Sequence, residues 1–154
     1  MSLIPDAVRR ELEARFGERL AGAVHLSLYT RPGSARLVLP AGMGCATCED
    51  TRQMAELIQQ SAPEKVTLEV IDVSRDPARA QADEVEEVPT IRIGPTSDAA
   101  RIAFQGLPVG TEFPALIDAV ERTSRGEHGL SQESLAGLAR LKKPAEVLVF
   151  ATPT

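Results

Sequence analysis

The sequence contains no tryptophan, and aromatic residues make up only 3% of it. Because 43% of the residues are hydrophobic, a core must be built mainly from aliphatic side chains. No apolar run approaches the roughly 20 residues that a membrane-spanning helix needs. Lysine and arginine number 17 against 22 aspartates and glutamates, without a basic patch of the kind that binds nucleic acid. These absences favour a globular protein with no membrane and no nucleic-acid partner.

The first residues show no export signal. Residues 1–6 contain no basic stretch followed by an apolar one, so we expect a cytoplasmic protein. A length of 154 residues fits one domain, or one domain and part of another. The composition changes after Thr123 to that of a linker. We therefore expect a main domain over residues 1–123, and a linker, helix and first strand of a second unit over residues 124–154.

Cysteine is also scarce, because Cys45 and Cys48 are the only 2 in the chain. They lie where a glycine-rich loop gives way to a helical pattern. Two thiols at this spacing can close a small disulfide and reopen it, and in a reducing compartment such a pair is more often catalytic or metal-binding than structural. A redox pair is therefore predicted. Half of a zinc site is the alternative, with only His25 and His128 left to supply nitrogen ligands.

Hydrophobic periodicity predicts alternating helices and strands along the chain. Apolar residues at every fourth position predict an amphipathic helix over residues 4–20, and similar spacing predicts later helices. Those helices cover residues 45–61, 77–85 and 131–142, with another capped by Thr111. Expected strands cover residues 24–29, 66–71, 90–93, 101–104 and 146–150. Residues 37–39 either continue the first strand or pair back on it.

The order of these elements predicts the fold class. A right-handed crossover makes the first two strands parallel, and the hairpin over residues 90–104 adds antiparallel strands. We therefore expect an α/β protein with a mixed sheet covered by helices, an extra N-terminal helix and a C-terminal helix–strand extension. The cysteines fall after the first strand region, at the edge where α/β sheets usually carry their chemistry.

Three motifs together resemble the thioredoxin fold. They are the cysteine pair before a helix, Val88-Pro89-Thr90 opening a strand, and Phe104-Gln105-Gly106 closing a hairpin. The stretch from Phe104 to Phe113 resembles the F-x-G-L-P-x-G-x-E-F sequence of glutaredoxin-like protein disulfide oxidoreductases, which carry two thioredoxin-like units in tandem. The chain is similar to the N-terminal unit of that family. It is also similar to the N-terminal domain of the flavoprotein subunit of alkyl hydroperoxide reductase, which passes electrons to a peroxiredoxin.

The resemblance implies a thiol–disulfide oxidoreductase that needs no bound cofactor. Cys45 would be the nucleophile, favoured as a thiolate by the positive end of a helix, and Cys48 would resolve the mixed disulfide. The bond between Val88 and Pro89 would be cis and lie against the cysteines. Four residues would bind the substrate: Val88, Pro89, Thr90 and Gly106. On the residues alone, Pro89 could simply begin a strand, and Gly106 could equally serve a tight turn.

Charges near the cysteines oppose one another. Glu49 and Asp50 disfavour a thiolate, and Arg31 and Arg52 are the candidates to compensate for them. Farther along, the acidic cluster over residues 83–87 is expected to form a solvated face, and Tyr29 is expected to lie in the core.

The expected partners follow from the same resemblance. They are protein disulfide substrates and, as a possible redox partner, a flavoprotein disulfide reductase or a peroxiredoxin. The protein would then take part in electron transport and in cell redox homeostasis. The alternative function is a thioredoxin-fold adaptor or electron-transfer module for such a peroxiredoxin or flavoprotein. The strand at residues 146–150 is expected to pair with its own sheet, with a second chain in a homodimer, or with a second domain.

Overall fold

A computed structural model describes residues 6–31 and 44–150. The elements run in this order: α1 (Asp6–Arg19), β1 (Val24–Thr30), α2 (Cys48–Ser61), β2 (Val66–Asp72), α3 (Pro77–Ala82), β3 (Thr90–Gly94), β4 (Ile102–Gln105), α4 (Glu112–Arg125) and α5 (Gln132–Ala139). Each predicted helix is present, although several begin later or end earlier than expected. The predictions for residues 4–5 and 37–39 lie outside the described residues. Within the described part, no helix has the length and apolar character to cross a membrane.

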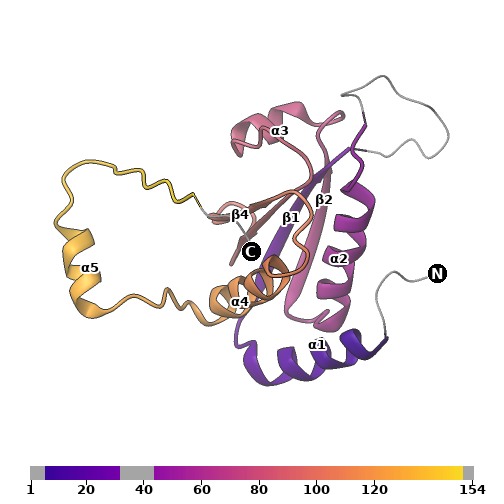
Figure 1. Cartoon of the computed structure of the whole chain (residues 1–154), viewed down its shortest axis with the longest axis horizontal. Coiled ribbons are helices and arrows are strands. Elements are labelled where there is room, and N and C mark those ends of the chain that lie inside the picture. The colour runs from indigo at the N-terminus through magenta and orange to yellow at the C-terminus, as the bar shows by residue number, and fades with distance from the viewer. Residues whose placement is uncertain (1–5, 32–43, 151–154) are drawn as a thin grey trace.

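The sheet is mixed, as predicted, with its strands in the order β2-β1-β3-β4. Strand β1 is parallel to β2, from Val24 opposite Val66 to Thr30 opposite Asp72. Strand β3 is antiparallel to both β1 and β4. The end of β1 therefore lies beside the end of β2 and the start of β3 (Figure 1). Cys45 and Cys48, at the start of α2, lie at this end of the sheet.

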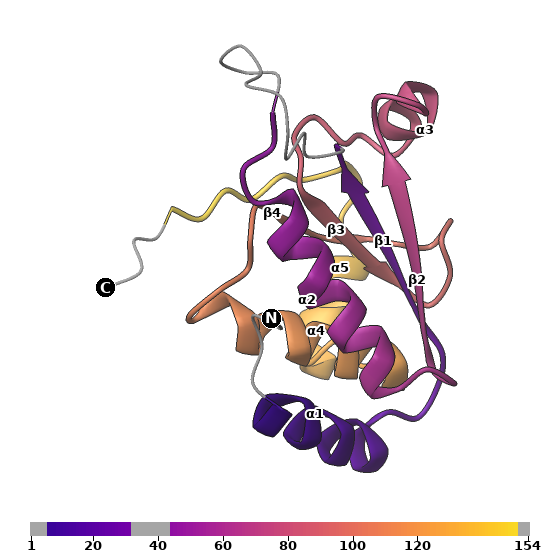
Figure 2. The same cartoon turned by 90° about the vertical axis from the view of Figure 1, so that its right-hand side faces the viewer.

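Helices cover both faces of the sheet, because successive side chains of a strand point to opposite faces. Leu28 of β1 belongs to the main core with Ile58 of α2 and Ile117 of α4. The next residue, Tyr29, belongs to a second cluster with Ala80 of α3. Helices α2 and α4 thus lie on one face and α3 on the other, with α1 crossing the far end of the molecule (Figure 2).

The extra N-terminal helix is held by both apolar and ionic contacts. Leu12 and Phe16 of α1 are buried in the main core. Arg15 Nε donates to the carboxylate of Glu121 in α4, and Arg19 Nη1 lies 3.4 Å from the other carboxylate oxygen. The Glu121 side chain is 0% exposed, whereas the two arginines reach solvent. A fully buried carboxylate therefore ties α1 to α4.

The starts of α3 and α5 use side-chain caps, whereas those of α2, at Thr47, and α4, at Thr111, do not. Asp76 accepts a hydrogen bond from the Arg79 N–H at 3.0 Å, and Pro77 follows it, as the sequence predicted for α3. Ser131 caps α5 by accepting from the Ser134 N–H at 3.1 Å. Thr111 precedes α4 without a side-chain cap bond, because its backbone is already helical, with φ −69° and ψ −18°.

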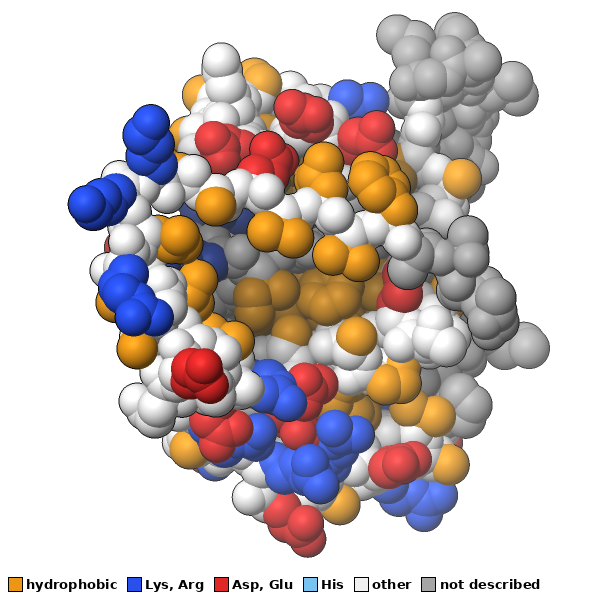
Figure 3. Space-filling view, turned by 60° about the vertical axis from the view of Figure 1, so that its left-hand side comes forward, with side chains coloured by type: hydrophobic (Ala, Val, Ile, Leu, Met, Phe, Trp, Pro, Cys, Tyr) orange, Lys and Arg blue, Asp and Glu red, His pale blue; other side chains and the backbone are white. Residues whose placement is uncertain are grey.

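Residues 146–150 form no strand in this single chain, so the predicted pairing with the chain's own sheet is wrong, whereas pairing with a second chain or a second domain stays a prediction. Strands β2 and β4 form the edges of the described sheet, and neither pairs with these residues. A single extended segment has no partner for its backbone groups and does not form a stable strand. Its side chains are consequently exposed, from 68% for Leu148 to 91% for Phe150. Figure 3 shows hydrophobic side chains around a hollow on the side where α5 lies.

The helical part of the extension is present as α5. Helix α4 continues to Arg125, two residues beyond the predicted boundary, and Ser124 is buried. The Ser124 hydroxyl accepts from the Ala21 N–H at 2.8 Å and from the Gly22 N–H at 2.9 Å, which ties the end of α4 to the segment before β1. The division into residues 1–123 and 124–154 stays a prediction.

Candidate redox site

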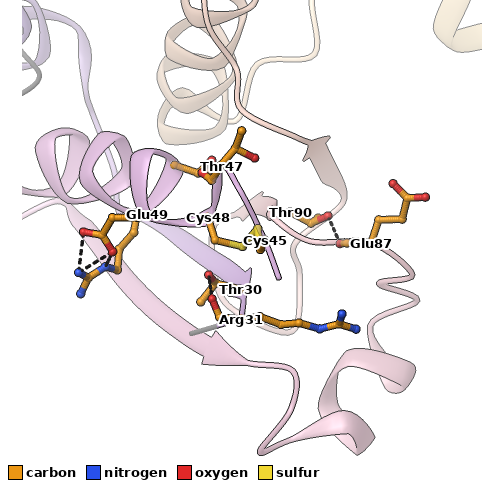
Figure 4. The surroundings of a disulfide bond; sticks show 10 residues. Thr30, Arg31, Cys45, Thr47, Cys48, Glu49, Glu87 and Thr90 are labelled. Atoms are coloured by element: carbon orange, nitrogen blue, oxygen red, sulfur yellow. Dashed lines mark hydrogen bonds and ion pairs between the residues drawn. A yellow bond between two sulfur atoms is a disulfide. The ribbon is translucent and has the colours of Figure 1, made fainter. Parts of the chain in front are cut away.

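The two cysteines form a disulfide at the start of α2, with their Cα atoms 5.4 Å apart (Figure 4). Cys48 is the first residue of the helix and is 2% exposed, whereas Cys45 is half-buried. The predicted helix start at Cys45 is therefore three residues too early. The helix begins after Thr47, whose carbonyl accepts from the Thr51 N–H at 2.9 Å. Cys45 lies just before the unpaired N–H groups of the first turn.

The acidic residues beside the cysteines are partly neutralised. Arg52 donates to Glu49 through Nη2 at 2.9 Å and Nε at 3.1 Å, and Arg52 also lies 3.7 Å from Glu56. The hydrogen bond from Arg52 holds the pKa of Glu49 below its usual value. Repulsion between Glu49 and a thiolate is thereby reduced, and Arg52 is already occupied.

Arg31 is placed differently. A groove of about 390 Å³ beside Cys48 is lined by Arg31 and Thr30 among others. In Figure 4 the Arg31 side chain extends away from the sulfur atoms. Among the described residues, the helix start is therefore the main source of positive potential next to Cys45.

The structure brings the four predicted substrate-binding residues together. The Val88–Pro89 bond is cis, as the resemblance implied, and Pro89 and Thr90 are buried. The Pro89 carbonyl accepts from the Gly106 N–H at 2.8 Å, which joins the start of β3 to the loop after β4. Gly106 has φ +86°, a conformation that favours glycine. The Thr90 hydroxyl donates to the Glu87 carbonyl at 2.7 Å and closes the turn around Pro89.

This loop belongs to the surroundings of the disulfide. Figure 4 draws Glu87 and Thr90, which flank Val88 and Pro89, together with Cys45. Within the described part of the chain, no hydrogen bond engages the backbone of Val88. Next to the cysteine pair there is therefore a stretch of backbone whose donor and acceptor groups are not used by any other described residue.

The histidines of the zinc alternative lie elsewhere. His25 is in β1, with Nε2 3.4 Å from a carboxylate oxygen of Glu69. His128 follows α4, and its Nδ1 accepts from the Leu130 N–H at 3.0 Å. Among the residues that the structure describes, no group of three or more histidine, cysteine, aspartate or glutamate side chains is arranged to hold a metal ion.

Sequence analysis missed a charged network behind the Pro89 loop. Asp83 was expected on a solvated face, but its side chain is only 20% exposed. It accepts from the buried Tyr29 hydroxyl and from Arg79 Nε at 2.6 Å, and Arg92 Nη1 lies 2.9 Å away. The one available signal was the spacing of Arg79 and Asp83, four residues apart in a helical pattern. Tyr29 lies in the core, as predicted.

Asp83 is held in its charged form. Burial pushes its pKa up, but hydrogen bonds from Tyr29 and Arg79 and the charges of Arg79 and Arg92 outweigh burial. The pKa of Asp83 therefore lies below its ordinary value. The network fixes the end of α3 against β1 and β3, directly before the loop that carries Val88.

We expect Asp83→Asn to lower the free energy of unfolding by about 1–2 kcal/mol at neutral pH, because the amide loses the charge that both arginines face. The folded pKa of Asp83 lies below its unfolded value, so this stabilisation is complete above the unfolded value. It is lost as the pH falls through the folded pKa. Urea denaturation of both proteins across acid pH measures the difference. Asp50→Asn, at an exposed position of α2, is the control, and a difference that persists unchanged in acid would contradict the assignment.

The mixed sheet, the disulfide at the start of α2 and the cis-proline before β3 define a thioredoxin fold. No protein-family model and no curated protein sequence matches the chain. Among solved structures, it is similar to a protein disulfide oxidoreductase from Aeropyrum pernix K1, with a TM-score of 0.73 and 25% sequence identity over 90% of this chain and 55% of the other. This likeness confirms the thioredoxin fold and the resemblance seen in the sequence.

A second similar structure is the NTD_N/C domain of the alkylhydroperoxide reductase AhpF from Enterococcus faecalis. Its TM-score is 0.68 at 20% identity, covering 91% of this chain and 62% of the other. At this identity the likeness shows the fold alone. The chain spans 55% and 62% of the lengths of these two proteins, so it corresponds to only part of each.

Proposed function

We propose that this protein is a thiol–disulfide oxidoreductase that reduces or exchanges disulfides in other proteins. The observation that carries the proposal is the difference between its two sulfurs. Cys45 is half-buried beside a free backbone edge, whereas Cys48 is 2% exposed in the first turn of α2. In such a pair, the more accessible Cys45 can attack a partner's disulfide, and the buried Cys48 can then release the partner.

In the proposed reaction, the Cys45 thiolate attacks one sulfur of the partner's disulfide. The partner's sulfur–sulfur bond breaks, its second sulfur leaves as a thiolate that takes up a proton, and Cys45 is joined to the partner. Cys48 then loses its proton and attacks the Cys45 sulfur, which releases the partner's remaining thiol. The partner gains two electrons, and the Cys45–Cys48 disulfide is the oxidised product.

The loop before β3 is proposed to hold the substrate. The unengaged backbone of Val88 would pair with an extended substrate segment, as in recognition by strand addition. Pro89 has no N–H group, so this position places no backbone hydrogen-bond donor close to the sulfurs. Thr90 and Gly106 would complete the binding surface, and their hydrogen bonds to Glu87 and Pro89 keep it in shape.

The oxidised pair must be reduced again for turnover. A flavoprotein disulfide reductase fed by a pyridine nucleotide is the proposed electron donor, and the cytoplasm is the proposed compartment. Membership of the glutaredoxin/thioredoxin-like class of oxidoreductases, and a homodimer formed through the C-terminal segment, belong to this proposal as well.

The second candidate is an adaptor or electron-transfer module for a peroxiredoxin or flavoprotein. The apolar side chains exposed over residues 147–150 favour it, because contiguous exposed apolar surface often marks a binding site. The two candidates differ in one respect. Partner binding that survives replacement of both cysteines by serine identifies the adaptor, whereas loss of function with the cysteines identifies the oxidoreductase.

Equilibration of the protein in graded glutathione and dithiothreitol buffers tests the proposal. The fraction of disulfide is read by thiol alkylation, and the same samples are assayed for reduction of a disulfide-bonded protein. We expect one reversible two-electron transition, with activity that follows the dithiol fraction. A disulfide that interconverts reversibly but transfers no electrons to any protein disulfide would refute the proposed function.

A further inference from the structure

A second groove of about 680 Å³ adjoins the candidate redox site, between α3 and the loop that leads to Pro89. Its apolar lining includes Val73, Ala80, Val85 and Val88. These side chains pack on the buried cluster that contains Tyr29. Val88 lies between Glu87 and Thr90 in the loop that Figure 4 draws beside the disulfide, so the groove adjoins the place where a partner's cystine would react.

The charge of the groove is uneven. Glu84 and Glu86 line it and are exposed, and within the described part of the chain neither forms an ion pair. Their neighbour Asp83 is instead engaged by two arginines. Among the described residues of the lining, Arg31 supplies the one positive charge, against the two carboxylates.

The groove is already shaped in the absence of a partner. The Val85 N–H donates to the Ala80 carbonyl at 2.9 Å, and the Glu84 N–H donates to the Gln81 carbonyl at 3.1 Å. Together with the Asp83 network, these bonds fix the segment that carries both acids. A preformed groove loses little conformational freedom on binding, which favours its use as a recognition site.

We propose that this groove selects the partner by binding the segment next to the partner's disulfide. An apolar side chain of that segment lies on the valine floor, and a neighbouring lysine or arginine faces Glu84 and Glu86. This inference rests on the proposed function. It adds a preference for disulfides whose neighbouring residues include an apolar side chain and a lysine or arginine. Charge complementarity with the groove, and not the cysteine pair, would determine this preference.

The binding step can be tested without redox chemistry. The probes are short labelled peptides without cysteine, in which one leucine is flanked by lysines in one peptide and by glutamates in the other. Fluorescence anisotropy measures their affinity for the full chain. We expect the lysine peptide to bind about three- to tenfold more tightly, the size expected of two partly exposed ion pairs, with a difference that shrinks at high salt.

A charge-matched pair of variants locates the effect. Glu84→Gln/Glu86→Gln should abolish the preference for the lysine peptide. Glu13→Gln/Glu18→Gln makes the same change of charge on α1, at the opposite end of the molecule from α3 (Figure 1). This control variant should retain the preference. Equal affinity for both peptides, or equal losses in both variants, overturns the inference. So does self-association that the Glu84→Gln/Glu86→Gln variant abolishes, because it would assign the groove to a second copy.

Cystine versions of the two peptides then separate the inference from the proposed function. We expect the charge preference to appear in KM and to disappear in the Glu84→Gln/Glu86→Gln variant, with kcat little changed. A binding preference without any turnover would reject the proposed function and leave the groove assignment standing. Turnover without a charge preference would reject the groove alone.

Discussion

Cys45→Ser is expected to abolish catalysed reduction of protein disulfides, lowering kcat/KM by at least about a thousandfold. A serine hydroxyl stays protonated at neutral pH and cannot form the mixed disulfide through which the exchange passes. The rate of reduction of a disulfide-bonded protein by dithiothreitol, with and without the variant, measures the loss. Ala46→Ser is the matched control, because it adds a hydroxyl between the cysteines and leaves both sulfurs in place.

Cys48→Ser should fail differently, because the two sulfurs differ in access. With Cys45 half-buried and Cys48 2% exposed, the variant retains the attacking sulfur and loses the resolving one. We expect it to accumulate a covalent complex with a protein substrate, visible by mass spectrometry without reductant. Capture of the substrate by Cys45→Ser instead would reverse the roles assigned to the two residues.

The parts of the site that sequence could predict are those encoded by neighbours in the chain. Alternating apolar residues predicted β1, and Asp76 followed by Pro77 predicted the start of α3. The cysteine spacing predicted a pair that can close a disulfide, and the disulfide is present. Each of these signals spans only a few residues, so local chemistry is enough to fix it. The cis bond before Pro89 is also present, but the resemblance implied it, because the residues alone allowed Pro89 simply to begin a strand.

What the sequence did not predict depends on contacts between distant residues. The hydrogen bond from Tyr29 to Asp83 joins residues 54 positions apart, and an acid in an acidic cluster gives no sign of such a partner. The segment 146–150 has the pattern of a strand, but a strand also needs a neighbour at the right edge of a sheet. Pattern decides what a segment can form, and the remainder of the fold decides whether it does.

The contact of α1 with α4 is another long-range feature, and it gives the largest expected change in stability. Arg15 and Glu121 are 106 residues apart, and Glu121 is 0% exposed. In Arg15→Met the buried carboxylate keeps only Arg19, at 3.4 Å. We expect the free energy of unfolding to fall by about 2–3 kcal/mol, below the full cost of an unpaired buried charge because Arg19 remains. Urea denaturation measures the change.

A double variant tests whether the buried Glu121 carboxylate, left without Arg15, causes that loss of stability. In Arg15→Met/Glu121→Met no carboxylate is buried, and Arg19, which is 56% exposed, can be solvated. We expect its stability to return to within about 1 kcal/mol of the native protein, because apolar replacement of a buried ion pair is often close to neutral.

A surface ion pair of α4 provides the control for both variants. Arg122 and Asp118 lie 2.6 Å apart but are 44% and 49% exposed, so Arg122→Met should cost less than about 1 kcal/mol. If the double variant instead stays as destabilised as Arg15→Met, α1 is held by the packing of these side chains. Recovery in the double variant shows that the burial of Glu121, and not the loss of Arg15 as such, makes the single change costly.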